Sequence, residues 1–530
     1  MRFAPSPTGP LHMGGVRTAL YNYLYAKQKG GDFILRIEDT DSKRFVPGAE
    51  KYIIESLRWC GIFPDEGVTE DGKVVETASE RHPHAPYRQS QRRGIYRAYA
   101  EQLVADGFAY YAFDTAEELD ARRAEAEAAG QTFIYGHATR GGLRNSLTLS
   151  SSEVSSLLSS RDDWTIRFKM PADRMVSMDD MIRGHIEVCT STLDDKVLWK
   201  KADELPTYHL ANIVDDHLME ITDVIRGEEW LPSLPLHYLL YEAFGWERPS
   251  FAHLSLLLKP VGNGKLSKRD GDKMGFPVFP LLWKSPEGEI SHGYREDGYF
   301  PEAFVNMLAL LGWNPGTEQE IFSLDELVKA FSMDKVQKAG AKFNPDKAKW
   351  FNKEYLRMKS SSELASLLVP VLRENGVAVA EAEGSADCVT MDYVEKCVEV
   401  LKDRATFVPD LWTAGWFLFK APAEYNEKDV AKFWKDEIPA MAQEALSAVC
   451  GAGSATAGTG ECAAGAAEAG LGMALEEFIR GREWPMGKVM NTIRLALTGA
   501  ASGLGISEIL SCIGGAEALG RFAHAREVLG

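Results

Sequence analysis

The segment RFAPSPTGPLHMGGVRTALYNYLYAKQKGGDFILRIE, residues 2–38, carries the clearest indication of the fold of this chain. It opens on a proline-rich turn, and apolar residues then follow at helical spacing on one face: Val16, Ala19, Leu20, Tyr23 and Leu24. This pattern predicts a helix that starts near Val16 and stops at Gly30 and Gly31. The compact apolar run FILRIE (33–38) predicts a buried strand. Strand, helix and strand form a βαβ unit, so we expect an α/β fold with a doubly wound, parallel, Rossmann-like sheet that binds a nucleotide.

The remaining sequence predicts an inserted domain and a helical C-terminal half. Helical patterns cover residues 94–105 and 116–129, whereas the serine-rich run at 145–160 and the strand-like WTIRFKM (164–170) indicate an α+β insertion. Beyond about residue 300 the patterns are helical, and the Gly/Ala run 451–472 is typical of a flexible surface insertion. The expected domains are the first half of the sheet domain at 1–107, the insertion at 108–205, the second half of the sheet domain at 206–275, a helical domain at 276–345 and an all-helical domain at 346–530.

Composition places the chain among globular, multidomain proteins. Its 530 residues predict about three or four domains. A hydrophobic content of 45% is enough for sizeable cores. No apolar run reaches the roughly 18 residues that a membrane span needs, and prolines stand where a signal peptide would have its apolar stretch. We therefore expect a cytoplasmic protein without a membrane partner. The seven cysteines form no CxxC pair, which favours reduced thiols.

The net charge of −18 opposes binding to a polyanion, so any contact with nucleic acid has to rest on local basic patches. Two such patches are present. Residues 335–359 hold eight Lys or Arg against two acids, and the stretch YRQSQRRGIYRAY (87–99) carries Arg88, Arg92, Arg93 and Arg97 with no acid among them. Each is a candidate phosphate-contacting surface, and the alternative for each is a solvated helix face.

Two short motifs could carry phosphate chemistry. In TGPLHMGG, His12, Gly14 and Gly15 stand next to a predicted helix N-terminus, where free N–H groups and the helix dipole favour an anion. In GNGKLSKRDGD, Lys265, Lys268 and Arg269 stand on a glycine-flanked loop that suits closure over a triphosphate. Taken singly, the first also fits an ordinary loop and cap, and the second a solvated basic loop.

Together the two motifs resemble the HIGH and KMSKS signatures of class I aminoacyl-tRNA synthetases. The resemblance is closest to the bacterial-type glutamyl-tRNA synthetases. It is carried, in the order of that family, by RFAPSPTGPLHMGG, LRIEDTD, PYRQSQRR, LPTYHLANIVDDHLMEITDVIRGEEWL and KLSKRDGD. It runs from Arg2 to KFNPDKAKWFN near residue 350, and more loosely through the helical remainder.

The resemblance implies two sets of site residues. Glutamate, with two carboxylates and one ammonium, calls for two cations, one carboxylate and neutral hydrogen-bonding groups. The implied glutamate-binding set is Arg2, Ala4, Ser6, Glu38, Tyr208, Asn212 and Arg226. The implied ATP-binding set is His12, Gly14, Gly15, Glu229, Leu258, Lys265, Ser267, Lys268 and Arg269, with His12, Lys265 and Lys268 catalytic. In the alternative interpretation Tyr208 and Asn212 face one another on a structural helix, and Glu38 pairs with a surface arginine.

Other features are not assigned to the site. Asp215, Asp216 and His217 include metal-ligand types, but adjacent residues rarely converge on one ion, so no protein-bound metal is predicted. GFAYYAFDT (107–115) has aromatic residues where some relatives have zinc-binding cysteines, so no structural zinc is expected. The sequence departs from the family at two places near its start. Gly15 stands where the class signature has a histidine, and relatives carry a few residues upstream of the position of Arg2. Segments 277–298 and 451–472 look like insertions that do not touch the site.

The resemblance implies a ligase that activates L-glutamate with ATP and Mg²⁺ and transfers it to the 3′ end of tRNA(Glu), acting as a monomer. The domain at 108–205 would bind the acceptor end, 276–345 the stem, and 346–530 the anticodon. Three alternatives stay open: a short paralogue that glutamylates a tRNA base, a glutaminyl-tRNA synthetase, and an inactive RNA-binding scaffold. The helical C-terminal region disfavours the first two, because the paralogue lacks it and the glutaminyl enzyme has β-structure there. Intact Glu38, Arg226 and Lys268 disfavour the third.

Overall fold

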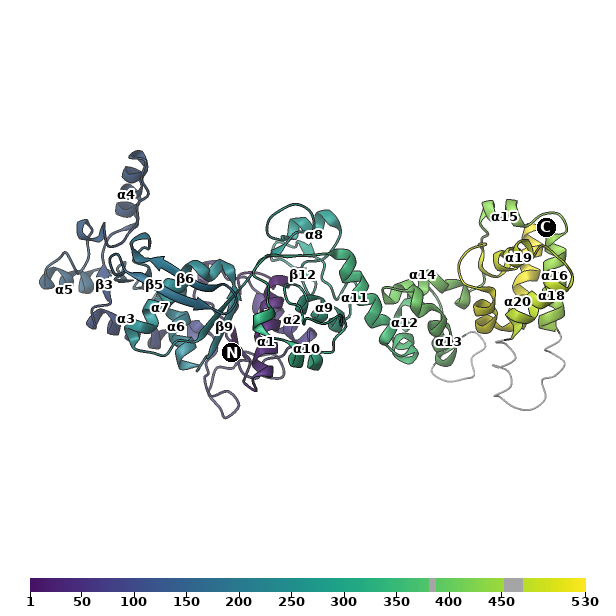
Figure 1. Cartoon of the computed structure of the whole chain (residues 1–530), viewed down its shortest axis with the longest axis horizontal. Coiled ribbons are helices and arrows are strands. Elements are labelled where there is room, and N and C mark those ends of the chain that lie inside the picture. The colour runs from purple at the N-terminus through teal and green to yellow at the C-terminus, as the bar shows by residue number, and fades with distance from the viewer. Residues whose placement is uncertain (381–387, 452–469) are drawn as a thin grey trace. The chain divides into compact units, whose positions relative to one another are not determined.

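The computed structural model describes residues 1–380, 388–451 and 470–530, in two compact units, Met1–Phe351 and Asn352–Gly530 (Figure 1). Most of the Gly/Ala run at 451–472 lies outside the described residues, so its predicted behaviour stays a prediction. Within the described residues no helix combines the length and the apolar character that crossing a membrane requires.

The first unit begins with the predicted βαβ arrangement. Strand β1 (Arg2–Phe3) pairs in parallel with β2 (Ile34–Leu35), and helix α1 (Met13–Gln28) connects them. Four of the five apolar residues predicted on one face of α1 are fully buried, and Tyr23 is half-buried. Two details differ from the prediction. The helix starts at Met13 rather than near Val16, because His12 caps it, and the FILRIE run pairs as a strand over two residues only.

The second half of the sheet domain repeats this parallel pairing. Strand β9 (Asp223–Gly227) lies beside β10 (Ser250–Leu254), with helix α7 (Leu234–Phe244) between them in the chain. The register sets Arg226 directly beside His253. Helix α6 (Tyr208–Leu218) precedes β9 and is buried on all sides over residues 210–216, so it is an internal helix. These parallel strands agree with the predicted doubly wound α/β fold.

The segment between these halves is an α+β region, as predicted. Its antiparallel sheet has the order β3-β4-β7-β8, formed by Ala109–Ala112, Thr165–Phe168, Val197–Lys200 and Leu205–Pro206. The predicted helices are present as α3 (Arg93–Ala105) and α4 (Ala116–Ala128), and α5 (Ser151–Ser160) covers the serine-rich run. A hairpin of β5 (Met175–Asp180) and β6 (Gly184–Cys189) packs on α7 and β10. This hairpin brings Asp180 next to the central strands.

After β10 the chain forms short strand pairs and then becomes mainly helical. Strand β11 (Leu257–Leu258) pairs with β14 (Ala341–Lys342), and α8 (Lys268–Met274) leads into the hairpin of β12 (Trp283–Lys284) and β13 (Ile290–Ser291). The helices that follow in the first unit are α9 (Pro301–Ala309) and α10 (Leu324–Ala330), and α11 (Pro345–Met358) begins there.

The second unit is built almost entirely of helices, as predicted for this part of the chain. The helices in its described residues that follow α11 are α12 (Ser361–Glu374), α13 (Met391–Leu401), α14 (Val408–Phe419), α15 (Glu427–Phe433), α16 (Ile438–Gly451), α18 (Leu471–Gly481), α19 (Met486–Thr498) and α20 (Ile506–Leu529). Their apolar faces meet in a core to which α16, α19 and α20 contribute Leu446, Ile493 and Ile509, all fully buried.

Candidate functional site

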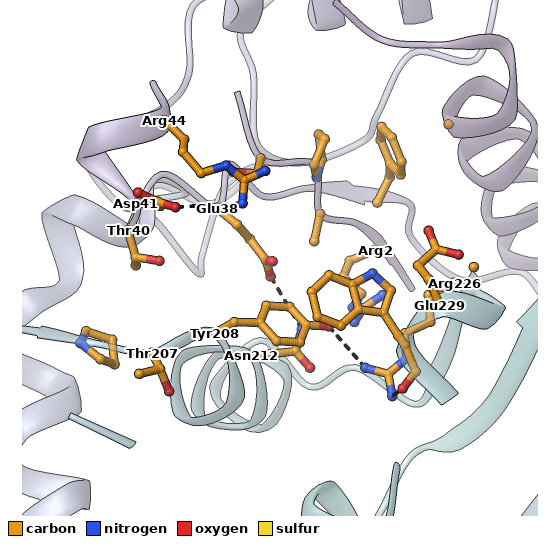
Figure 2. Close-up of a pocket in the computed structure, with 18 of the residues that line it drawn as sticks. Arg2, Glu38, Thr40, Asp41, Arg44, Thr207, Tyr208, Asn212, Arg226 and Glu229 are labelled. Carbon is orange, nitrogen blue, oxygen red and sulfur yellow. Dashed lines mark hydrogen bonds and ion pairs between the residues drawn. The ribbon is translucent and has the colours of Figure 1, made fainter. Parts of the chain in front are cut away.

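The largest concentration of predicted site residues lines one open cavity of the first unit, with a volume of about 720 Å³. Figure 2 shows part of its lining. All seven predicted glutamate-binding residues lie on its wall: Arg2, Ala4, Ser6, Glu38, Tyr208, Asn212 and Arg226. The fold brings them together from β1, the loop after β2, helix α6 and strand β9, so residues more than 200 positions apart share one surface.

A buried network of charges fixes the floor of this cavity. Arg2 donates from Nε and Nη2 to the two carboxylate oxygens of Asp216, at 3.0 and 3.2 Å. Arg36, which is fully buried, donates to Asp216 at 2.8 Å and to Glu38 at 2.9 Å. With its oxygen turned toward the guanidinium groups, Asn212 accepts from Arg2 and Arg36 at 3.1 Å each. Burial raises the pKa of Glu38, and Arg36 and Arg2 oppose that rise.

The alternative interpretation of Glu38 is therefore only half right. Glu38 does pair with an arginine, but its partner is the buried Arg36 rather than a surface residue. Asp215 and Asp216 serve the same network, since Asp215 accepts from Arg92 at 2.8 Å, while His217 stacks on Trp246 with ring centres 3.8 Å apart. The three adjacent side chains thus face different partners, and the described residues contain no group of three metal-ligand side chains.

The same cavity is also lined by Arg226 and Tyr208. The phenol oxygen of Tyr208 accepts from Arg226 Nη1 at 3.0 Å (Figure 2), and its ring stacks on Trp230 with centres 4.0 Å apart. Burial raises the pKa of Tyr208, so the phenol keeps its proton at neutral pH. The cavity therefore brings together two guanidinium groups, a carboxylate, a phenol and an amide.

Beside the cavity, the turn before α1 holds His12 in a defined orientation. His12 is the N-cap residue of α1, and its Nδ1 accepts the N–H of Gly14 at 3.2 Å. The ring proton must then lie on Nε2, which is buried and has no hydrogen-bond partner among the described residues. Burial, with Lys265 adding to it, lowers the pKa of His12 to about 4. The imidazole is neutral at pH 7 and offers one unused N–H. Gly14 and Gly15 lie in the first turn of α1, not before it.

The other predicted ATP-binding residues lie at different places. Gly15 and Glu229 line the cavity, whereas the carbonyl of Leu258 accepts from Phe343 in the β11–β14 pair. Lys265, Ser267, Lys268 and Arg269 lie in the loop before α8 and in its first turn, where Ser267 caps the helix by bonding Asp270. The cavity wall does not include this loop.

The segment 277–298 does touch the predicted site, contrary to expectation. Glu289 in the β12–β13 hairpin accepts from Lys268 Nζ at 2.6 Å. The ring of Phe279 meets His12 edge-on, with centres 5.9 Å apart, and the Val278 carbonyl accepts the N–H of Met13. A motif comparison along the chain could not reveal this, because the hairpin folds back over residues that precede it.

The arginine patch at 88–97 is also not the surface that was predicted. Arg88 pairs with Glu50 and Glu76, Arg97 pairs with Glu101, and the buried Arg92 is bound to Asp215. The local charge count failed because most of these partners come from distant parts of the sequence. Of this cluster, these three guanidinium groups are already neutralised by carboxylates.

Sequence reasoning missed several residues of the cavity wall. Thr40, Asp41 and Arg44 line it beside Glu38, and Trp230 closes it over Tyr208. The signal that was available is adjacency, since Thr40 and Asp41 belong to the LRIEDTD motif that already supplied Glu38. Arg36 lies in the same motif and holds the network together from below.

Comparisons with known proteins show the class to which this chain belongs. Residues 1–350 match the catalytic domain of class I tRNA synthetases for glutamate and glutamine (E and Q), and residues 363–526 match an anticodon binding domain. The fold and the cavity thus define a class I tRNA synthetase.

The relatives narrow this class further. The chain is 53% identical to a glutamate–tRNA ligase of Porphyromonas gingivalis over 100% of its own length and 99% of the relative, and 52% identical to one of Parabacteroides distasonis, over 100% and 98%. A crystal structure of a glutamate tRNA ligase from Elizabethkingia meningosepticum, in complex with its amino acid, superposes with a TM-score of 0.88 at 50% identity, covering 100% of this chain and 99% of that one. The chain belongs to the glutamate–tRNA ligase family.

Proposed function

We propose that the chain activates L-glutamate with ATP to glutamyl-adenylate and transfers the glutamyl group to the 3′ end of tRNA(Glu). The observation that carries this proposal is that Arg2, Arg226 and Glu38 line one cavity. Guanidinium groups only donate hydrogen bonds, so they match the two carboxylates of glutamate, and Glu38 matches its ammonium group. A glutamine side chain would turn an amide N–H toward one of these donors.

The activation step needs positioning and charge stabilisation rather than a covalent enzyme intermediate. We assign the unused Nε2–H of His12 to a phosphate oxygen of ATP, because it is a buried donor without a partner among the described residues. Lys265 and Lys268 would add positive charge as charge develops at the phosphorus under attack. Lys268 has to leave Glu289 to do so.

Mg²⁺ enters this proposal only as a companion of the ATP phosphates. The described residues hold no group of three His, Cys, Asp or Glu side chains that could bind a metal by themselves. The chain's own contribution is therefore to bind the amino acid, orient its carboxylate and supply hydrogen-bond donors to the phosphates.

For tRNA, we propose that the second unit receives anticodon bases in a cavity of about 950 Å³. Trp416 and Tyr425 on its wall offer aromatic faces for stacking, and Lys420 offers positive charge, whereas Arg404 on the same wall pairs with Glu508. The Tyr425 hydroxyl is buried and has no partner among the described residues, so it can bond a base edge. The cavity lies within the part of the chain that matches an anticodon binding domain.

The decisive experiment charges purified tRNA(Glu) and tRNA(Gln) with labelled glutamate, and repeats the reaction with labelled glutamine. We expect glutamate to be attached and glutamine not, and Arg226→Leu to raise the KM for glutamate at least tenfold, about 1.4 kcal/mol. Arg174→Leu is the matched control, because Arg174 makes a bidentate pair with Glu242 on the exposed surface. Equal charging with glutamine, or equal effects of the two variants, would refute the assignment.

A further inference from the structure

Arg226 is held by two imidazole groups in addition to Tyr208. Its Nε donates to Nε2 of His253 at 2.9 Å, and its Nη1 lies 3.2 Å from Nδ1 of His237. The parallel register of β9 and β10 places His253 directly beside Arg226, and His253 is fully buried. The Nη2 group makes only a long contact of 3.4 Å to the Trp230 carbonyl among the described residues. The guanidinium is thus fixed along its Nε and Nη1 edges, and Nη2 is left to meet a ligand.

The direction of these bonds fixes where the proton of His253 lies. A guanidinium group has no acceptor, so Nε2 of His253 must present its lone pair to Arg226. The ring proton then lies on Nδ1, which is 2.6 Å from Oδ2 of Asp180. The other oxygen of Asp180 accepts the backbone N–H groups of Ile182 and Arg183, at 3.0 and 2.8 Å. Asp180 therefore acts as an anchored acceptor that selects one tautomer of His253.

The charges around this chain of bonds agree with a neutral imidazole. Burial lowers the pKa of His253, and although the bond to Asp180 opposes this, Arg226 lowers it further. Burial alone would raise the pKa of Asp180, but the bonds from His253 and from the backbone bring it below its usual value. An ionised aspartate, a neutral histidine and a guanidinium thus stand in line, and all three residues are buried.

We propose that Asp180 and His253 are positioning residues for the amino-acid substrate, which set the orientation of Arg226 by fixing the tautomer of the histidine between them. The inference rests on the proposed function of Arg226 as a carboxylate anchor, and it names two residues outside the lining of the cavity. It also gives the β5–β6 hairpin, which supplies Asp180, a part in amino-acid binding.

Isosteric substitutions test the tautomer directly. In Asp180→Asn, the amide oxygen stays with the two backbone N–H groups, so the amide NH₂ faces Nδ1 of His253 and moves the ring proton to Nε2. Nε2–H then opposes the N–H of Arg226, donor against donor. We expect the KM for glutamate to rise about tenfold or more while the KM for ATP stays within about twofold. Asp179→Asn is the matched control: Asp179 also contacts a histidine, His185, but in solvent.

Two substitutions at His253 separate positioning from packing. Glutamine can place an oxygen near the Nε2 position and accept from Arg226, whereas asparagine reaches only the Nδ1 position and loses that bond. We expect His253→Gln to keep the KM for glutamate within about threefold of wild type and His253→Asn to raise it about tenfold. A purely structural role would impair both variants together, with equal losses in melting temperature.

The outcomes separate this inference from the function on which it rests. Arg226→Lys is measured in parallel by ATP–pyrophosphate exchange with tRNA present. If Arg226→Lys raises the KM for glutamate but Asp180→Asn and His253→Asn do not, the positioning role is wrong and the anchor stands. The positioning role is also wrong if His253→Gln is as impaired as His253→Asn. If Arg226→Lys leaves the KM for glutamate unchanged, Arg226 is not a carboxylate anchor, and the positioning role that depends on it is wrong as well.

Discussion

Replacing Asp216 by asparagine should destabilise the first unit strongly, because this carboxylate lies between two buried guanidinium groups. Asp216 is 1% exposed and accepts hydrogen bonds from Arg2 at 3.0 and 3.2 Å and from Arg36 at 2.8 Å. Asparagine keeps one acceptor oxygen but turns an NH₂ group toward Nη2 of Arg2. It also removes a negative charge. Arg2 and Arg36 carry two positive charges, and Glu38 balances only one of them.

Breaking a buried ion pair in this way costs about 3 to 5 kcal/mol. The entropy of unfolding is about 2.1 cal/mol/K per residue, so the free energy of unfolding of a unit spanning residues 1–351 changes by roughly 0.7 kcal/mol per degree near its melting temperature. The expected fall in melting temperature is therefore about 4 to 7 °C. It should appear in the calorimetric transition of the first unit, with the second unit unchanged.

Asp163→Asn provides the matched control. Asp163 also receives a bidentate contact, from Arg161 at 2.7 and 2.6 Å, but its side chain is 53% exposed. Exposed pairs are worth no more than about 1 kcal/mol, so this variant should melt within about 1.5 °C of wild type. The reasoning is refuted if Asp216→Asn also melts within that range, or if the two variants lose the same stability.

Three further predictions concern charge. Lys268→Ala should slow adenylate formation on the order of 100- to 1,000-fold in rapid-quench assays. Glu289→Gln frees Lys268 and should lower the KM for ATP by no more than about fivefold. A small effect of Lys268→Ala together with a large effect of Glu289→Gln would exclude Lys268 from activation. Lys349 and Lys353 have no ion-pair partner among the described residues, so changing both to glutamine should reduce the slope of log K for tRNA against log salt by about two units, and an unchanged slope would place the RNA surface elsewhere. Burial lowers the pKa of His209 to about 4, so below pH 6.5 the unfolded chain binds a proton that the folded chain does not. In urea unfolding, His209 should lower the free energy of unfolding by about 1.4 kcal/mol for each pH unit as the pH falls from 6.5 to 4. His209→Gln should remove that part of the pH dependence.

The match between prediction and structure is best where the signal is local. The five apolar positions of α1 share one face because a helix repeats every 3.6 residues, and four of them are fully buried. The glutamate-binding set was implied by motifs whose residues stand at fixed offsets, and its seven members do line one cavity. Start points were less exact, since the cap by His12 moved the start of α1 to Met13.

Partners supplied from elsewhere in the chain escaped prediction. The arginines at 88–97 looked free because only their neighbours were counted, yet Arg92 is bound to Asp215, 123 positions away. Lys268 looked free as well, until the β12–β13 hairpin brought Glu289 to it. Net charge along a sequence does not describe net charge at a surface, because ion pairs form between segments that only the fold brings together.

Periodicity and motif spacing are properties of neighbouring positions, so they were enough to predict the βαβ beginning, the helical C-terminal half and the residue types of a site for an amino acid with two carboxylates. How those residues are held depends on contacts that form only in the folded chain. Asp180, His253 and Arg226 come from three strands, and His253 contacts Asp180 across 73 positions. The pairing of β9 with β10 and the packing of the β5–β6 hairpin bring them into line, and hydrogen bonds of that kind depend on distances in space that no local pattern encodes.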